Sequence, residues 1–400
     1  MRTLRLALAA ALVAAAALAQ DGAEKSSLLR GPVVSIDGAA TLVDVTLAPG
    51  EKDARLLATW TTSEGTRTAT VSFQPFAKRL RARLEAPPAT SVTYDVVAAS
   101  GSLAHGTLRT LPAPGTTALT FCALGDTGWP RRGDGQAGEP QLGVARLMEE
   151  QRPDLVLHTG DIIYLVGQWQ SFDPLFFKPY AATLGRVPFF VTLGNHDVKT
   201  KDGKFTVDEF PFPTNQNGNR FYSFDAANVH FVCLDSNEIE VCESTEKFLA
   251  TRQGEWLAAD LAATKAMWKV VWFHYPLLSL NKSHKPETTI MRNVLEKVLD
   301  GAGVDLVVNG HDHFYHRSRR LRGHEPSDDG VVHVITGGGG AALYKGDPDK
   351  DRFTAEFASR FHFTRFDVDG MKMRIRAFGT DEGGKPEVFD DATIAPRKAR

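Results

Sequence analysis

The chain has 400 residues, of which 42% are hydrophobic and 24% are charged, and its formal net charge is −2. This composition is typical of a soluble globular protein, and the length allows two domains or one large domain with an appendage. Because the net charge is close to zero, we expect neither nucleic acid nor a membrane as a partner. The three cysteines are too few for a disulfide framework, although a Cys233–Cys242 pair stays open.

The N-terminus has the pattern of a signal peptide over residues 1–19. Arg2 and Arg5 give a basic start, and Leu6–Ala19 is an apolar run that is too short to span a bilayer. Ala17-Leu-Ala19 is a small-x-small cleavage site. The alternative is an N-terminal anchor that is never cleaved. We therefore expect export to the periplasm or the extracellular space.

Residues 31–110 predict a small all-β sandwich domain, because short apolar runs alternate there with turn-rich pieces. The runs are 33–36, 41–47, 54–60, 67–73 and 91–97. Groupings of His, Asp and Glu are sparse, so a packing or recognition role is favoured over catalysis. Residues 111–117 hold two prolines and a glycine and predict a linker to the next domain.

From residue 118 to 392 the pattern changes to strands that alternate with helices, followed by more strands. The predicted strands are 119–124, 155–158, 187–193, 221–225, 229–235, 269–274, 304–308, 331–336, 361–368 and 371–378. Helical patterns cover 141–151, 169–184, 247–266 and 287–299, and the second of them is interrupted near Pro174 and Pro179. Asp369-Gly370 predicts a tight hairpin. The expected fold class is α/β (α+β), with two packed mixed β-sheets flanked by helices.

Five motifs each end a predicted strand, where open α/β sheets bind their ligands. They are Gly125-Asp126-Thr-Gly128, Gly160-Asp161-Ile-Ile-Tyr164, Gly194-Asn195-His196-Asp197, Phe273-His274 and Gly310-His311-Asp312-His313. Singly, each motif also fits a turn, a helix cap or a core histidine. Together they supply oxygens, imidazoles and a phenol for two metal ions, with Asp161 able to bridge them. Such ligands suit Zn, Fe and Mn, and a phenolate favours Fe(III).

With these motifs the chain resembles the calcineurin-like metallophosphoesterases and, within them, the purple acid phosphatases. The resemblance covers roughly Leu119 to Phe378, and the tyrosine of Gly-Asp-x-x-Tyr separates this family from most relatives. It implies the metallophosphoesterase fold, with a sandwich similar to the N-terminal domain of the larger members. The strings Gly-Asn-His-Asp, His-Tyr-Pro and Gly-His-Asp-His resemble the small tartrate-resistant members instead.

The resemblance also implies a role for each metal-binding side chain. Fe(III) is expected on Asp126, Tyr164 and His313, and Asp161 is expected to bridge. A divalent partner, Fe(II), Zn or Mn, is expected on three further side chains: Asn195, His274 and His311.

Two histidines are implied in catalysis. His196 would contact the phosphate, and His284 would contact the substrate and protonate the leaving group. An exposed histidine in the irregular loop 280–285 is the other interpretation of His284. Asp197 and Asp312 are expected to orient neighbouring ligands. The run Gly337–Gly340 fits either a close backbone approach to the site or a plain tight turn.

The expected function is that of an exported acid phosphatase whose substrates are small-molecule phosphomonoesters. The resemblance implies direct attack of a metal-bound hydroxide on phosphorus and an acidic pH optimum. A phosphodiesterase or nucleotide pyrophosphatase with the same two metals is the alternative, since substrate choice depends on loops such as 198–219 and 237–246. A non-catalytic exported binding protein is a further alternative from a different class.

Overall fold

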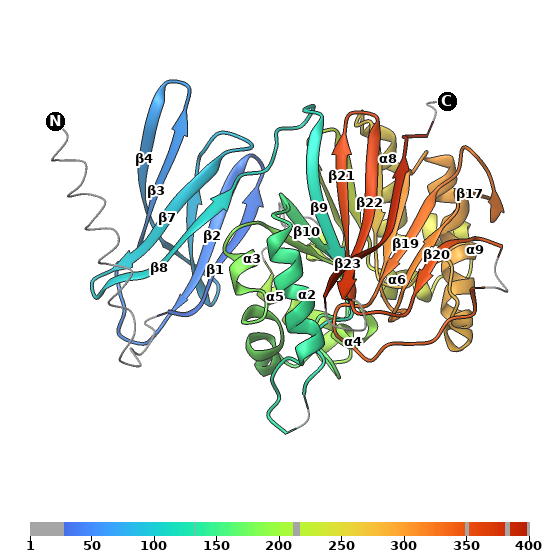
Figure 1. Cartoon of the computed structure of the whole chain (residues 1–400), viewed down its shortest axis with the longest axis horizontal. Helices are drawn as coiled ribbons and strands as arrows, with labels where there is room; N and C mark the ends of the chain where they lie inside the picture. Colours follow the sequence, from blue (N-terminus) through green and yellow to red (C-terminus); the bar gives the residue numbers. More distant parts are fainter. Residues whose placement is uncertain (1–27, 132, 211–216, 349–351, 381–384, 398–400) are drawn as a thin grey trace.

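We describe the protein from a computed structural model, drawn in Figure 1, over residues 28–131, 133–210, 217–348, 352–380 and 385–397. The predicted signal peptide, residues 1–19, lies outside the described residues. Across the described part of the chain, no helix has both the length and the apolar character that crossing a membrane requires.

The N-terminal region is all-β, as the alternating runs predicted, and forms the blue part of Figure 1. Its strands make two antiparallel four-stranded sheets, β1-β2-β6-β5 and β4-β3-β7-β8. Their bounds are β1 (Leu28–Asp37), β2 (Ala40–Leu47), β3 (Arg55–Thr62), β4 (Gly65–Ser72), β5 (Gln74–Phe76), β6 (Arg79–Leu84), β7 (Ser91–Ala98) and β8 (Gly101–Arg109). Alternate residues such as Leu56 and Ala58 face the shared core, while Leu57 is exposed.

Two mixed sheets follow, which confirms the predicted fold class. The first has six strands in the order β11-β10-β9-β21-β22-β23, and the second has seven in the order β12-β13-β14-β15-β19-β16-β20. The bounds in the first sheet are β9 (Ala118–Leu124), β10 (Leu155–His158), β11 (Phe189–Val191), β21 (His362–Asp369), β22 (Lys372–Thr380) and β23 (Pro386–Ile394). In the second they are β12 (Tyr222–Ala226), β13 (Val229–Cys233), β14 (Trp268–Trp272), β15 (Leu306–Asn309), β16 (Tyr315–Ser318), β19 (Val332–Thr336) and β20 (Thr354–Ala358).

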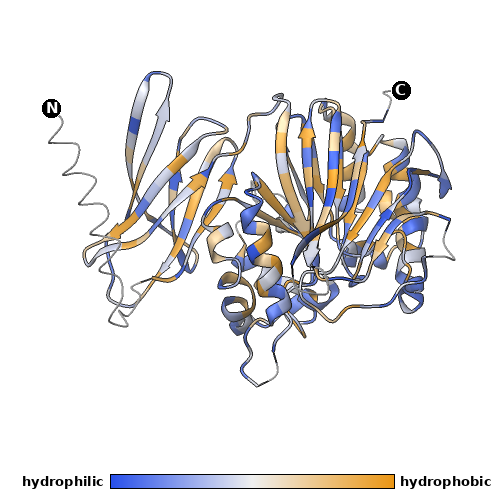
Figure 2. Cartoon of the chain, viewed as in Figure 1, coloured by the Kyte–Doolittle hydropathy of each residue, from blue (hydrophilic) through white to orange (hydrophobic). Residues whose placement is uncertain are grey.

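The two mixed sheets pack face to face over an apolar core. Phe121 of β9 meets Phe231 of β13 with ring centroids 5.2 Å apart, and Trp272 of β14 belongs to the same buried cluster. Orange, hydrophobic residues concentrate on these central strands in Figure 2. Parallel strands with long apolar runs are expected where both faces are covered.

Helices cover the outer faces of both sheets. The longer ones are α2 (Glu139–Glu150), α8 (Arg252–Ala263) and α9 (Lys285–Gly301). The shorter helical pieces are η1 (Trp169–Ser171), η2 (Asp173–Phe177), α3 (Ala181–Leu184), α4 (Asn195–Val198), η3 (Lys201–Gly203), α5 (Lys204–Glu209), η5 (Asn217–Asn219), α6 (Ser236–Glu240), α7 (Thr245–Leu249) and η6 (Lys282–His284). A two-stranded ribbon of β17 (Leu321–Arg322) and β18 (Glu325–Pro326) completes the described elements.

The prediction of one helix over 247–266 was wrong, because the chain forms α7 and α8 there with a break between them. The Thr251 amide closes α7 by donating to the Phe248 carbonyl, and its hydroxyl then caps α8 by accepting from the Gly254 amide at 3.1 Å. A threonine N-cap satisfies donors that a new helix leaves free. The Asp369-Gly370 hairpin is confirmed, since Asp369 pairs with Lys372.

The disulfide alternative is not realised, because Cys233 and Cys242 are separate buried thiols. The Cys233 thiol points to the Val191 carbonyl and that of Cys242 to the Glu238 carbonyl.

The all-β region packs directly against the mixed sheets' helical layer. Arg30 of β1 pairs with Asp173 at 2.6 Å, and the Tyr94 hydroxyl donates to the Gly185 carbonyl at 2.9 Å. In the predicted linker, the Gly115 amide donates to the Ala227 carbonyl at 2.7 Å. The proposed domain boundaries on either side of 111–117 stay a prediction.

Candidate metal centre

The five motifs meet at one edge of the paired sheets, because each follows the carboxyl end of a parallel strand. Strands β9, β10 and β11 are neighbours in the six-stranded sheet and are followed by Asp126, Asp161 and Asn195. Strands β14 and β15 are neighbours in the second sheet and are followed by His274 and by the histidines of Gly310–His313. The two sheets therefore contribute side chains to the same place from opposite sides.

One group of donor atoms gathers around the Tyr164 phenol. Its oxygen lies 2.8 Å from Asp161 Oδ2, 3.0 Å from Asp126 Oδ1 and 2.9 Å from His313 Nε2. Tyr164 and Asp126 are buried, with 3% and 0% of their surfaces exposed. A phenol oxygen, two carboxylates and an imidazole nitrogen thus converge within hydrogen-bonding distance.

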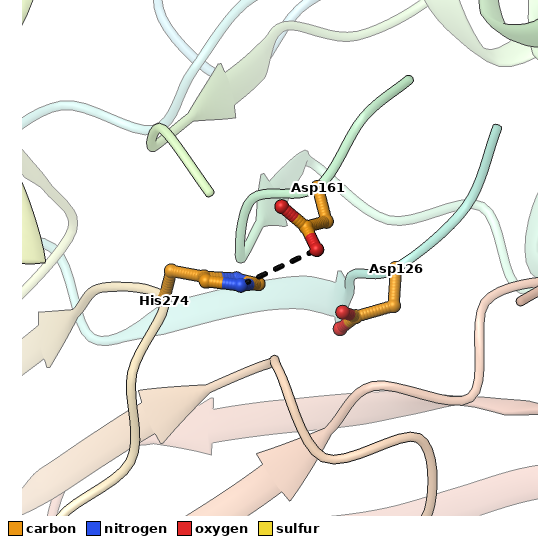
Figure 3. Close-up of side chains that lie close together, drawn as sticks. All are labelled: Asp126, Asp161 and His274. Carbon is orange, nitrogen blue, oxygen red and sulfur yellow. Dashed lines mark ion pairs between the residues drawn. The ribbon is translucent and has the colours of Figure 1, made fainter. Parts of the chain in front are cut away.

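A second group gathers around the Asn195 amide oxygen. Asn195 Oδ1 lies 3.0 Å from His274 Nε2 and 3.2 Å from His311 Nδ1, and these two ring nitrogens are 3.2 Å apart. His274 Nε2 also lies 3.5 Å from Asp161 Oδ2. Asp161 therefore touches both groups, and Figure 3 shows it between Asp126 and His274.

The outer nitrogens of two histidines fix which nitrogen faces the cluster. His274 Nδ1 lies 2.9 Å from the Thr159 carbonyl, and His313 Nδ1 lies 2.7 Å from the Ala342 carbonyl. Each Nδ1 donates to a carbonyl, so Nε2 presents its lone pair to the cluster, as in metal-binding histidines. The donor atoms of Asp126, Asp161 and His274 lie within 4.8 Å of one another and can hold a metal ion.

Burial and neighbouring charges together raise the pKa values of two groups in the cluster, Tyr164 and His274. Burial and then the nearby Asp126 and Asp161 carboxylates raise the pKa of Tyr164 well above its usual range. Although burial opposes its charge, His274 has its pKa raised to about 9, chiefly by Asp161. Without a cation the cluster therefore holds protons that metal binding would displace. This chemistry fits a metal site, because cations bind the deprotonated phenol and the neutral imidazole.

Backbone strain and crowding also concentrate here. Asp126, Asp161 and His311 have φ angles of 58°, 51° and 68°. Residues other than glycine rarely adopt such angles, and those that do cluster at functional sites. For the run Gly337–Gly340, the structure favours a close backbone approach to the site over a plain tight turn. A Cβ added at Gly337 would lie 2.7 Å from Asp126 Oδ2.

A sequence model of the calcineurin-like phosphoesterase family matches residues 119–315, the segment that carries all five motifs. The chain contains a calcineurin-like phosphoesterase domain. Purple acid phosphatase 22 of Arabidopsis thaliana is 31% identical over 247 residues, which are 57% of this chain and 51% of that protein. The chain spans about half the length of the curated relatives that it matches.

Solved structures support the fold of the phosphoesterase domain and of the region before it. The purple acid phosphatase PPD1 from yellow lupin (Lupinus luteus) seeds superposes with a TM-score of 0.75 at 20% identity. That match covers 91% of this chain and 74% of the lupin chain. PhoD superposes with a TM-score of 0.68 at 13% identity, covering 94% of this chain and 92% of that one. At these identities the comparison concerns the fold alone.

The two predicted catalytic histidines lie at the rim of the candidate metal centre. His196 is part-exposed, and its ring centroid is 4.3 Å from that of Tyr164. His284 comes from the η6 turn, yet its side chain is only 16% exposed and its ring centroid is 4.0 Å from that of His311. The alternative interpretation of His284 as an exposed loop histidine is therefore wrong.

The two predicted orienting carboxylates contact different parts of the site. Asp312 accepts from His284 Nδ1 at 2.6 Å. Asp197 accepts backbone donors, from Gly194 at 2.9 Å and from Ile162 at 3.0 Å, and so fixes the loops that carry Asp161 and Asn195. Burial raises the pKa of Asp197 to about 7.

Sequence reasoning missed two rim residues of the candidate metal centre. Tyr344 stacks on His313 with centroids 4.0 Å apart and an interplanar angle of 11°, and its amide donates to the His313 carbonyl at 3.0 Å. Lys199 Nζ lies 3.2 Å from His196 Nδ1. Neither residue belongs to a strand-end motif. The Gly337–Gly340 run was the available signal for the Tyr344 loop.

Proposed function

We propose that this protein is an exported dinuclear-metal acid phosphatase that hydrolyses phosphomonoesters. The observation that carries the proposal is the pair of donor groups, one around the Tyr164 phenol and one around the Asn195 amide, that share Asp161. Two cations held side by side are the usual arrangement for hydrolysis of phosphate esters. The relatives named purple acid phosphatase support the same reading.

In this proposal Asp126, Tyr164 and His313 would hold Fe(III), and Asp161 would be shared by both ions. Asn195, His274 and His311 would hold Fe(II), Zn or Mn. When bound, the two ions lower the pKa of an attacking water and neutralise charge on the phosphoryl oxygens. The buried phenol supports the trivalent ion, since a cation of high charge is needed to ionise a group whose pKa burial raises.

The chain's own side chains complete the reaction. His196 donates a hydrogen bond to a phosphoryl oxygen at the open rim, with Lys199 adding positive charge beside it. His284 delivers a proton to the departing ester oxygen. Asp312 holds His284 through Nδ1, which leaves Nε2 for the substrate.

A visible absorption spectrum with metal analysis of the purified protein tests the proposal. We expect about two metals per chain and a broad band near ~550 nm from tyrosinate-to-Fe(III) charge transfer. Para-nitrophenyl phosphate should turn over at acid pH, and Asp161→Asn should abolish this. A colourless protein with two Zn or Mn ions would instead favour diesters at neutral pH. Absence of metal after reconstitution would overturn the proposal.

Export is the remaining part of the proposal and has its own test. Residues 1–19 supply the basic start, the apolar run and the cleavage site. Mass spectrometry of the full-length product secreted by an expressing cell should find Gln20 as the first residue. A product that keeps Met1 and stays with the cell would contradict export by cleavage.

A further inference from the structure

A polar cavity of about 400 Å³ lies between the all-β region and the phosphoesterase domain. Ser91 and Thr107 line it from β7 and β8, Thr120 from β9, and Arg186 from the segment after α3. None of the metal-centre side chains lines it. The cavity is therefore a separate feature that the proposed phosphatase reaction leaves unexplained.

Arg186 reaches this cavity without the partners that a buried guanidinium needs. The residue is 8% exposed, and its Nε is buried with no hydrogen-bond partner. Its Nη2 makes only a long contact, 3.4 Å, to the Pro153 carbonyl. Because buried donors in proteins are nearly always satisfied, an unmatched guanidinium on a residue that lines a cavity points to an acceptor that binds there.

The arginines around the cavity outnumber the acids available to them. Asp154 is committed already, since Oδ1 accepts from Arg109 Nε at 2.6 Å and Oδ2 accepts from the Thr120 amide at 2.9 Å. Arg152 lines the cavity with an exposed side chain that pairs with no acid in the described part of the chain.

Charges near Arg186 act in both directions. Burial, and then repulsion by Arg152, lowers the pKa of Arg186. Glu149 on α2 opposes this shift and is a partly exposed carboxylate near the same guanidinium. The summed charge of the arginines and acids around the cavity remains positive.

We propose that this cavity binds a small tetrahedral oxyanion of the phosphate or sulfate class. Arg186 and Arg152 would provide forked charge-assisted donors, the geometry that guanidinium groups offer to such ions. Ser91 and Thr107 line the wall contributed by the all-β region. The volume leaves room for the ion and its waters.

The site joins the two regions of the chain. The Arg109 amide donates to the Arg186 carbonyl at 2.9 Å, so the strand β8 and the Arg186 segment are already tied at the cavity wall. An anion held by Arg186 and Arg152 that also contacts Ser91 or Thr107 would add one more link between the all-β region and the phosphoesterase domain. Its binding is expected to fix their relative orientation.

Isothermal titration of the full-length Asp161→Asn protein with sodium phosphate, and separately with sodium sulfate, tests the proposal. Asp161→Asn is expected to remove turnover, and the heat that Arg186→Gln or Arg152→Gln removes is the part that reports the cavity. We expect one saturable site, with sodium chloride at matched ionic strength giving none. Adding Arg186→Gln or Arg152→Gln should weaken binding at least ~10-fold, which is about 1.4 kcal/mol.

Arg55→Gln is the matched control, because Arg55 is an exposed arginine on β3 outside the cavity. It should leave the affinity unchanged. Arg152 is exposed, so its variant is expected to fold even if the Arg186 variant does not. The single variant Arg152→Gln, which keeps Asp161, should hydrolyse substrate at the rate of the parent protein. No saturable heat in Asp161→Asn, or equal affinity with and without Arg152→Gln, would overturn the proposal. Neither result bears on the metal centre.

Discussion

His284 Nδ1 lies 2.6 Å from Asp312 Oδ1, although one residue comes from the turn before α9 and the other from the end of β15. Asp312 also accepts from Ser279 Oγ at 2.5 Å, so both of its oxygens are occupied. The pair fixes the imidazole over His311 with its other nitrogen turned away from the carboxylate. Such a carboxylate–histidine pair gives a general acid a defined orientation.

His284→Asn is expected to lower kcat by ~10²-fold if the imidazole protonates the leaving group. The loss should be larger for an alkyl phosphate, whose leaving group needs the proton, than for para-nitrophenyl phosphate. Steady-state kinetics with both substrates measure this difference. Ser283→Ala, in the same turn, should stay close to the parent. An equal loss for both substrates would indicate a positioning role instead.

Gly194→Ala should reduce turnover by at least ~100-fold, because small displacements of reacting groups cost about that much. The added Cβ would overlap Asp161 Oδ1 and lie 2.7 Å from Asp161 Cγ. Gly143→Ala in α2 is the control, since a Cβ there meets nothing within 4 Å. It should stabilise the protein by roughly 0.5–1 kcal/mol without changing turnover. Full activity and metal content in Gly194→Ala would contradict the crowding argument.

Arg30→Met should lower the free energy of unfolding by roughly 2–4 kcal/mol, because it leaves the buried Glu209 carboxylate without its paired cation. Arg30 pairs with Asp173 and with Glu209, and its own side chain is 15% exposed while that of Glu209 is 8% exposed. Arg67→Met is the matched control: the Arg67 and Glu64 side chains are 54% and 75% exposed, so the loss should be below ~0.5 kcal/mol. Urea denaturation compares the two, and equal losses would argue against a buried network between the regions.

His230 should make the free energy of unfolding depend on pH in the alkaline range. Its ring nitrogens each lie 2.8 Å from a carboxylate, Asp225 and Asp260. Burial opposes the charge, but these two acids raise the pKa of His230 to about 9. A raised folded-state pKa contributes stability that is complete below the unfolded value of ~6.5 and is lost as pH rises through the folded value.

His230→Asn should therefore destabilise the protein by at least ~1 kcal/mol at pH 6, with the difference from the parent shrinking toward pH 9.5. Thermal unfolding across this range provides the measurement. His105→Asn removes an exposed pair with Asp95, whose two side chains are 65% and 41% exposed, and should have little effect at any pH. A constant difference for His230→Asn would show that its role is packing rather than charge.

The sequence was most informative where chemistry sits directly at the end of an apolar strand. Asp126, Asp161 and His274 each follow a buried run, and parallel strands bring their carboxyl ends to one edge regardless of the loops between them. Tyr344 and Lys199 could not be predicted in this way, since their positions depend on the paths of loops. Strands β16 and β20 were missed because each is short and interleaved with polar residues.

The spacing of apolar residues predicted the buried face of each helix better than the residues at which the helix begins and ends. Residues 247–266 show helical spacing on both sides of Thr251, so the spacing of apolar residues gives no sign of the break between α7 and α8. The break is seen only in the structure, where the Thr251 hydroxyl donates to the Phe248 carbonyl. The single helix over 287–299 was predicted well, because α9 keeps one apolar face over its full length.

Strand β9, which leads into Asp126, has its two neighbours far apart in the sequence: β10 on one side and β21 on the other. Phe366 of β21 stacks on Phe121 of β9 with centroids 4.5 Å apart, and the Tyr315 hydroxyl donates to Asp390 of β23 at 2.5 Å. The segment 119–315 that matches the family therefore packs against strands that follow it in the chain. A protein truncated after residue 315 would expose an unpaired β9 edge beside the metal centre, and self-association rather than an active core is the expected result.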